Sequence, residues 1–455
     1  MDQCACRSSS IPPPPAPSLG GPVLYQPRFH QRTRLFTIVR DHLDEFIRAY
    51  PNRFAARFGP LRPEVEKGFR AFLRCGAPED GFATFRCPGC GASFIVPFSC
   101  KHWLCPSCSA KRTLDWAAWL VTEVLYDQPH YHIVATLPPA VRDYFIRDRK
   151  LLGWLASAFA QMLNRHLVEG CRHPRAIPGI ITVPQTFGEK LNPNPHFHVL
   201  ATTMNVDPET GGYHETRFPS FWELRHHWRN LVLAFLEGAK KITRKQLLEL
   251  RQQFPKGFHV NISVPGSAPE RQYGTDREPR AAVLASVGKY LVRTPLTEAR
   301  LAGYAGGKVT LRYRGYEFGE SGMLHKKTDP DYEELDALEL LARLSVHIPL
   351  PRKHHTRYSG AYSTRFRGRM RKLGIAPRPE AEGKLRKECR QAWARLIKHL
   401  YQDDPLQCPE CGEQMKLVRL VGPGSAREKY KQLRPSLLYY GDRGVIRREP
   451  LPRPP

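Results

Sequence analysis

Apolar side chains recur every three or four residues in several stretches of the chain, which is the spacing of one buried helix face. This spacing predicts helices within residues 33–73 and at 110–126, 151–168, 221–240 and 279–293. Runs rich in β-branched and aromatic residues predict strands at 131–137, 179–185, 196–204, 258–264 and 308–313. Helices and strands alternate from residue 128 to 320, so the predicted fold is α/β (α+β), one sheet with helices packed on it. The runs at 179–185 and 196–204, joined by a loop rich in Gly, Asn and Pro, predict two antiparallel strands.

The composition divides the chain into four parts. Residues 1–30 are rich in proline and predict a flexible leader, because they cannot bury enough apolar surface to fold. Residues 31–112 combine a helical segment with clustered cysteines, and residues 113–325 contain the predicted sheet. Residues 326–455 are basic and predicted to be mostly helical, with a Cys-Pro-x-Cys turn and a proline-rich end.

The charge balance indicates the kind of partner. The chain of 455 residues has 70 Lys and Arg against 43 Asp and Glu, a formal net charge of +27, which predicts a polyanionic partner. Apolar residues make up 41% of the chain, enough to build cores, and this excludes a wholly disordered protein. No apolar run reaches the roughly 18 residues that cross a bilayer, and no secretory leader is seen. We therefore expect a cytoplasmic protein.

Six of the twelve cysteines lie between Cys75 and Cys108. Two Cys-x2-Cys pairs, at 87–90 and 105–108, are separated by fourteen residues. Two such thiolate pairs can close a tetrahedron around Zn²⁺, so we expect a structural zinc site made by Cys87, Cys90, Cys105 and Cys108. The same segment offers substitutes, or parts of a second site: Cys75, Cys100 and His102.

A second half-motif, Cys408-Pro-Glu-Cys411-Gly, has no matching pair after it. A zinc site there would need Cys389 or His399 to complete it. A plain turn with reduced thiols is an equal alternative.

Two histidines lie at alternate positions of the predicted strand 196–204. His196 and His198 therefore point to one face, while Phe197 points to the other. Two imidazoles on one face form half of a divalent-cation site. The pair His130 and His132 has the same spacing and is a rival for this role.

Tyr290 lies on the predicted helix 279–293, which has one apolar face and is followed by Pro295. Lys289 and Arg293 flank it. Cations close to a phenol lower its pKa from about 10 and can also hold a phosphate. A structural tyrosine is the alternative reading, since the chain has 18 of them.

No acidic residue occurs between residues 351 and 379, where cations and aromatic residues are interleaved. Cations for phosphates and aromatic rings for base stacking are typical of a surface for single-stranded nucleic acid. A solvated basic linker is the alternative. The residues expected to bind DNA are Arg352, Lys353, Arg357, Arg365, Arg367, Arg369 and Arg371.

Taken together, these motifs resemble those of a known family. His196-Phe197-His198 follows an Asn/Pro loop, Tyr290-Leu-Val-Arg293 lies downstream, and the cysteine-rich stretch lies upstream. In this combination the chain resembles the HUH-type rolling-circle transposases of the insertion sequence ninety-one family, which carry an N-terminal transposase zinc-binding domain. The likeness extends from about Cys75 to Val421 and includes Gln185-Thr-Phe-Gly and the stretch from Asp404 to Gly412.

The resemblance implies an HUH catalytic domain at 113–325 that acts on single-stranded DNA at transposon ends and targets, in the nucleoid. His196 and His198, with Gln185 as third ligand, would hold catalytic Mg²⁺ or Mn²⁺ against the scissile phosphate. Tyr290 would then form a 5′-phosphotyrosine link and release a 3′-hydroxyl.

One departure from the family pattern and two alternative functions remain. Members with two tyrosines carry the second one four residues after the first, where this chain has Thr294, so it resembles the single-tyrosine variety. A second transfer would then use the freed 3′-hydroxyl or a second protomer of a homodimer.

Two other functions are alternatives to a transposase: a zinc-dependent DNA-binding protein without catalysis and a rolling-circle replication initiator. The chain has no G-x-x-x-x-G-K-[ST] phosphate loop, which argues against large replicative proteins.

Overall fold

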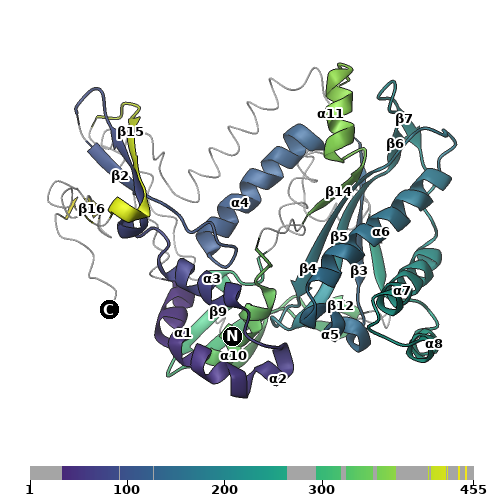
Figure 1. Cartoon of the computed structure of the whole chain (residues 1–455), viewed down its shortest axis with the longest axis horizontal. Coiled ribbons are helices and arrows are strands. Elements are labelled where there is room, and N and C mark those ends of the chain that lie inside the picture. Colours follow the sequence, from purple (N-terminus) through teal and green to yellow (C-terminus); the bar gives the residue numbers. More distant parts are fainter. Residues whose placement is uncertain are drawn as a thin grey trace, which may run out of the picture. The chain divides into compact units, whose positions relative to one another are not determined.

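The computed structural model describes residues 33–91, 93–126, 128–263, 294–318, 324–351, 356–375, 408, 411–426, 428, 439–440 and 446–447. The chain forms two compact units (Figure 1). The larger unit comprises residues 28–75 and 99–396, and the smaller one comprises residues 76–98 with those from 397 onward and the N-terminal residues 1–27. The leader at 1–30 and the expected helix at 279–293 lie outside the described residues.

A five-stranded antiparallel sheet, in the order β14-β4-β5-β3-β8, forms the centre of the larger unit. The predicted pairing of the runs at 179–185 and 196–204 is confirmed, with Val183 opposite His198 and Gln185 opposite His196. The mixed helix-and-sheet fold is also confirmed. The strands are β3 (His130–Thr136), β4 (Gly179–Phe187), β5 (Pro193–Thr202), β8 (Val260–Ser263) and β14 (Arg357–Gly360).

Helices cover one face of this sheet (Figure 1): α5 (Pro139–Arg147), α6 (Lys150–Glu169) and α7 (Phe221–Gly238), with α8 (Arg244–Gln253) against α7. Alternation along β5 sends Phe197 into this core, where it is fully buried. The ring of Trp228 packs on Phe197, and its Nε1 donates to the Thr136 carbonyl at 3.1 Å. The same alternation leaves His196 and His198 on the opposite face.

The opposite face is partly covered by α4 (Pro106–Trp119), its π-helical continuation η3 (Leu120–Val124) and α11 (Thr364–Lys372). Apolar side chains of the sheet meet those of the helices there in a second, smaller core. The helix predicted at 110–126 corresponds to α4 and η3. The residues of this core include Leu120, Val124, Ile181, Val183, Leu200, Tyr362 and Phe366.

A third core of the larger unit joins segments far apart in the sequence. Helices α1 (Arg34–Arg53), α2 (Ala55–Phe58), α3 (Pro63–Leu73) and α10 (Ala337–His347) enclose it with a sheet of order β13-β10-β9. The expected boundary at residue 325 is not observed, since α10, α11, β13 and β14 belong to the larger unit and their apolar residues complete its cores. The strands are β9 (Leu301–Ala305), β10 (Lys308–Tyr313) and β13 (Asp331–Asp336).

The smaller unit is built on a three-stranded sheet of order β15-β1-β2, in which β1 (Phe82–Arg86) pairs with both β2 (Ser93–Pro97) and β15 (Lys416–Val421). No helix within the described ranges is long and apolar enough to span a bilayer. The remaining short elements are β6 (Met204–Val206), β7 (Tyr213–Glu215), β11 (Tyr316–Phe318), β12 (Leu324–Lys326), β16 (Tyr439–Tyr440), β17 (Ile446–Arg447), η2 (Pro78–Asp80) and η6 (Glu298–Arg300).

Candidate active site and metal centres

The two histidines of β5 approach each other on the sheet face that does not bear the main helical layer. The Nε2 atoms of His196 and His198 are 3.1 Å apart. Two adjacent ligands of an octahedral cation, each about 2.1 Å from it, are about 3.0 Å apart, so one ion fits both nitrogens. Gln185 lies opposite His196 in register and is 7% exposed, so its strand position puts it on the same face. Two imidazoles and an amide oxygen suit Mn²⁺ better than Mg²⁺, which prefers oxygen ligands.

Hydrogen bonds of the other ring nitrogens orient both imidazoles. His196 Nδ1 donates to the backbone carbonyl of Asn194 at 2.7 Å, which leaves a lone pair on Nε2 in the neutral ring. His198 Nδ1 lies 3.0 Å from His132 Nε2, and the two rings are nearly parallel, at 8°. Such partners fix ring orientation in metal sites, so His132 would position His198.

The rival pair on β3 is divided between two environments. His130 is 1% exposed, its ring stacks on Tyr362, and its Nε2 contacts the Tyr362 hydroxyl. It therefore belongs to the core under α11, whereas His132 joins the β5 histidines. The structure thus brings His196, His198 and His132 together, with Gln185 beside them.

The expected catalytic residues Lys289, Tyr290 and Arg293 lie outside the described residues. Lys289 follows Ser263, the residue that ends β8 and pairs with His132 of β3, by 26 positions in the sequence. The described chain resumes at Thr294.

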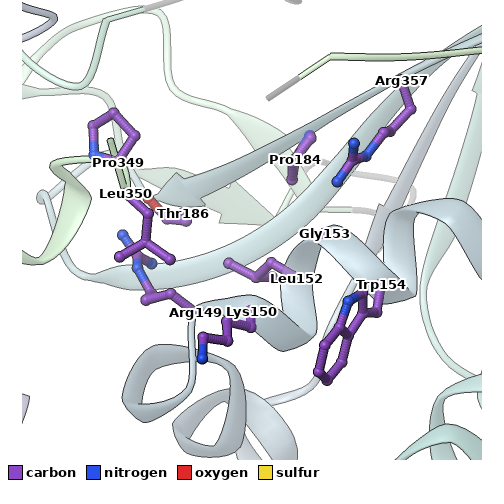
Figure 2. A pocket seen from close by; sticks show the side chains of 10 residues that line it. All are labelled: Arg149, Lys150, Leu152, Gly153, Trp154, Pro184, Thr186, Pro349, Leu350 and Arg357. Atoms are coloured by element: carbon purple, nitrogen blue, oxygen red, sulfur yellow. The ribbon is translucent and has the colours of Figure 1, made fainter. Parts of the chain in front are cut away.

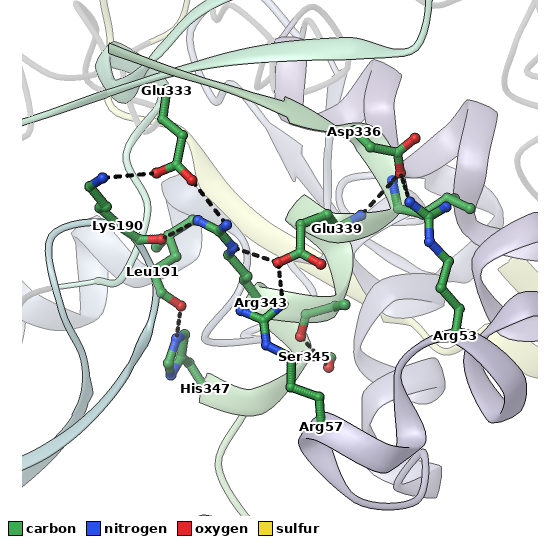
Figure 3. A network of polar contacts seen from close by, with 12 residues as sticks. Arg53, Arg57, Lys190, Leu191, Glu333, Asp336, Glu339, Arg343, Ser345 and His347 are labelled. Carbon is green, nitrogen blue, oxygen red and sulfur yellow. Dashed lines mark hydrogen bonds and ion pairs between the residues drawn. The ribbon is translucent and has the colours of Figure 1, made fainter. Parts of the chain in front are cut away.

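Helix α10 holds the turn that precedes the histidine strand (Figure 3). His347 Nε2 donates to the Leu191 carbonyl at 2.9 Å, and its Nδ1 lies 3.0 Å from Thr186 Oγ1. Leu191 has a φ of +57° and a fully buried side chain, a conformation that costs about 1 kcal/mol and needs tertiary support. Burial lowers the pKa of His347 to about 3, so this ring is neutral near pH 7.

Arg343 of the same helix binds the other side of that turn. Its guanidinium donates to the Lys190 carbonyl at 3.0 Å and pairs with Glu339 at 2.7 Å and Glu333 at 3.0 Å (Figure 3). Burial alone would lower the pKa of Arg343, but its bonds to Glu333 and Glu339 hold that pKa above its ordinary value. The turn is thereby fixed from α10, and with it the start of β5.

Four cysteines of the larger unit form a cluster that we call the α4 cluster: Cys75, Cys100, Cys105 and Cys108. The Sγ atom of Cys75 lies 3.6 Å from that of Cys108 and 3.8 Å from that of Cys105. Hydrogen bonds with Cys100 and Cys105 lower the pKa of Cys75 to about 7. Two thiolate ligands of one tetrahedral Zn²⁺ are about 3.8 Å apart, so these sulfurs fit one zinc ion.

Four cysteines of the smaller unit form a second cluster, the β1 cluster: Cys87, Cys90, Cys408 and Cys411. The expected set of Cys87, Cys90, Cys105 and Cys108 is thus not brought together. The pair 105–108 opens helix α4 and meets Cys75 at the end of α3, whereas the pair 87–90 follows strand β1. Cys87 and Cys90 accompany the pair 408–411, and the expected partners Cys389 and His399 lie outside the described residues.

Comparisons with known proteins identify the family. A model described as "Transposase zinc-binding domain" matches residues 38–137, and one described as "Putative transposase" matches residues 179–369. The chain is 25% identical to "Transposase for insertion sequence element IS801" of Pseudomonas savastanoi pv. phaseolicola, over 78% of this chain and 84% of that protein. It is also 25% identical to "Putative transposase y4qJ" of Sinorhizobium fredii (strain NBRC 101917 / NGR234), over 81% of this chain and 92% of that protein. The chain belongs to the IS91 family of transposases. No solved structure matches it.

The two matched ranges of this transposase coincide with its candidate sites. The zinc-binding model covers the whole α4 cluster but only the pair 87–90 of the β1 cluster. The transposase model covers β4 and β5 and ends within α11. Cys408 and Cys411 lie beyond both ranges.

The basic residues that the sequence assigned to DNA differ in exposure. Arg365, Arg369 and Arg371 of α11 are exposed, and Arg371 also lies 3.8 Å from Glu123, so a phosphate backbone can reach all three from solvent. Arg367 is 9% exposed, donates to the Tyr362 carbonyl at 3.2 Å and lies over the Trp119 ring. It therefore has a structural role, because it sits beside the buried face of α11. Arg352 and Lys353 lie outside the described residues.

Arg357 borders a pocket of about 150 Å³ between α6 and the edge of the sheet (Figure 2). Arg149, Lys150 and Trp154 of α6 and its preceding residue line the same pocket. Burial lowers the pKa of Arg149 to about 9, and its Nη1 has no hydrogen-bond partner among the described residues. Trp154 is 59% exposed. Arg149, Lys150 and Trp154 are not among the residues predicted from the sequence. A tryptophan on the polar side of α6, close to two cations, is the sequence feature that could have indicated them.

Proposed function

We propose that this transposase cuts single-stranded DNA at the ends of its element, with Tyr290 as nucleophile and a divalent cation held by His196 and His198. The observation that supports this most is the 3.1 Å approach of the two Nε2 atoms, each on a ring oriented through its other nitrogen. Gln185 is the proposed third ligand, because it lies opposite His196 in register. The ordered turn held by α10 keeps this arrangement in place.

The proposed cleavage is a transesterification. The phenolic oxygen of Tyr290 bonds to the scissile phosphorus while the bond from phosphorus to the 3′ oxygen breaks. The phenol loses its proton to solvent, and the leaving 3′ oxygen takes one up. The products are a 5′-phosphotyrosine and a free 3′-hydroxyl, and attack by a 3′-hydroxyl on that linkage reverses the step and transfers the strand. A bound cation would supply charge neutralisation at the phosphate, which Lys289 and Arg293 would assist.

The proposed second transfer follows from the residue that stands four positions after Tyr290. Because Thr294 stands where a second tyrosine would be, the proposed second transfer uses the freed 3′-hydroxyl or the tyrosine of a second protomer. This is a rolling-circle scheme with one nucleophile per chain.

Two further parts complete the proposal. The α4 cluster would hold a structural zinc ion, as its sulfur spacing and the matched zinc-binding family support. The DNA strand would contact the exposed arginines of α11 and the pocket of Arg149 and Arg357, where cations can meet phosphates and Trp154 can stack on a base. The place of action would be the nucleoid, where this DNA lies.

A covalent adduct is the direct test of the cleavage step. Purified protein is incubated with single-stranded DNA from the element ends and Mn²⁺, then denatured and separated by electrophoresis. We expect an adduct in the wild type and in the matched control Tyr332→Phe, whose ring is 58% exposed, and none in Tyr290→Phe. An adduct that persists in Tyr290→Phe would show that another residue is the nucleophile.

The metal ligands are tested in the same assay. His196→Ala and His198→Ala should each abolish the adduct, while His227→Ala, at an exposed position of α7, should leave it unchanged. A wild type that binds single-stranded DNA but forms no adduct would favour the DNA-binding protein without catalysis.

A further inference from the structure

Two copies of one short motif meet in the smaller unit. The motif is Cys-Pro-x-Cys-Gly, at residues 87–91 and 408–412. In each copy the glycine N–H donates to the carbonyl of the first cysteine, Gly91 to Cys87 at 3.1 Å and Gly412 to Cys408 at 2.8 Å. Gly91 and Gly412 have φ values of +76° and +77°, a region that favours glycine. The two copies therefore share this hydrogen bond and this glycine conformation, although 317 residues separate Cys90 from Cys408.

The four sulfurs of the β1 cluster are spaced for a metal ion. The Sγ atoms of Cys87 and Cys411 are 3.4 Å apart, and those of Cys90 and Cys408 are 3.5 Å apart. All four lie within 4.8 Å of one another. These distances are close to the roughly 3.8 Å between thiolates on one zinc ion and well above the roughly 2.05 Å of a disulfide bond.

We propose that the β1 cluster binds a second zinc ion, distinct from that of the α4 cluster, and that this ion fastens strand β15 to strand β1. The site draws one thiolate pair from each of two distant segments. Two of its ligands, Cys408 and Cys411, lie outside the range matched by the zinc-binding family model, so that range accounts for only half of the site.

The four ligands of the β1 cluster differ in their exposure to solvent. Cys87 and Cys408 are 1% and 0% exposed, while Cys90 and Cys411 are exposed, so an ion would have two buried and two accessible ligands. This arrangement gives zinc a route from solvent.

The described residues of the smaller unit form little apolar core. Within these ranges the core consists of two small clusters, one around Phe82 and Val421 and the other around Cys87, Cys408 and Met415. Leu417, Val418 and Leu420 of β15 are each more than half exposed and add little to it. Small domains of this kind are commonly stabilised by a structural metal or by disulfides. Cys87 and Cys408 of the β1 cluster belong to the second apolar cluster, so a bound ion would stabilise that cluster directly.

Zinc stoichiometry by native mass spectrometry tests the proposal on the full-length protein purified without chelator. We expect two zinc ions per chain in the wild type and in the control Cys171→Ser, whose cysteine belongs to neither cluster. The double variant Cys408→Ser, Cys411→Ser should retain one, and so should Cys105→Ser, Cys108→Ser. One zinc ion in the wild type, unchanged on replacing Cys408 and Cys411, would overturn the proposal.

A second measurement on the wild type does not depend on whether the variants fold. Alkylation followed by peptide mapping should leave Cys411, which is exposed, unmodified in the zinc-loaded protein and modified after chelation. Modification of Cys411 at the same rate in both states would contradict zinc binding. An intact mass lower by four hydrogens, found under non-reducing conditions without zinc, would show that two disulfides take its place.

Discussion

His347 offers a pH dependence that can be worked out from the structure. Burial lowers its pKa from 6.5 to about 3 in the folded chain, and its two ring nitrogens meet Thr186 Oγ1 and the Leu191 carbonyl. Because the folded pKa lies below the unfolded one, the unfolded chain takes up more protons as the pH falls. The stability from this group is therefore complete above about pH 6.5 and is lost as the pH falls from there toward 3. One pH unit corresponds to 1.36 kcal/mol for each proton taken up, so the free energy of unfolding should fall by about 2 kcal/mol between pH 7.5 and pH 5 because of this group.

The assay is urea unfolding at pH 7.5 and pH 5, followed by tryptophan fluorescence. All seven tryptophans lie between residues 103 and 393, so the signal reports the larger unit. The comparison is His347→Gln, which can still donate to Leu191 but does not titrate. Between pH 7.5 and pH 5 the free energy of unfolding of the wild type should fall by about 2 kcal/mol more than that of this variant, because all other groups titrate in both proteins. An equal fall of the free energy of unfolding in both proteins would refute the reasoning that His347 stays neutral against the turn that precedes β5.

Three further predictions concern the site and its support. His132→Ala should weaken Mn²⁺ binding by about 10–100-fold, measured by isothermal titration, because His198 loses the partner that orients it; unchanged affinity would remove His132 from that role. Phe197→Ala should lower the free energy of unfolding by about 3–5 kcal/mol in urea, since the ring is fully buried behind the histidines; a loss below about 1 kcal/mol would mean that this core is not closely packed. Trp154→Ala should weaken single-stranded DNA binding by about 1–3 kcal/mol in fluorescence anisotropy, whereas Trp222→Ala, equally exposed on α7, should not; equal effects would exclude a specific stacking site at the pocket.

The face of the histidine strand could be predicted from the sequence because strand periodicity is a local property. Alternation alone predicted that His196 and His198 point to one face of the strand and Phe197 to the other. In the structure Phe197 lies in the core and the two imidazoles lie together on the other face. The fold class and the antiparallel pairing followed from the same kind of pattern. Of the motifs that carry the family resemblance, His196-Phe197-His198 lies on β5 and Gln185-Thr-Phe lies on β4.

The partners of each cysteine pair could not be predicted from spacing, since they depend on which chain segments pack together. The nearest pairs in sequence, 87–90 and 105–108, belong to different units. A sequence signal did exist: glycine follows the pairs 87–90 and 408–411, while Ser109 follows Cys108 and continues into helix α4. Arg367 was misplaced for a related reason, because its charge was counted without its position beside Phe366 on the buried side of α11.

The two neighbours of strand β1 lie at very different distances from it in the sequence. One edge of β1 pairs with β2, which follows it within a few residues, and the other edge pairs with β15, which begins at Lys416. The ribosome therefore makes β1 long before β15, and the three-stranded sheet can form only after Val421 has been synthesised. Any truncated copy of the element that stops before residue 416 would produce a chain whose amino-terminal hairpin keeps an open edge, available for pairing with another chain.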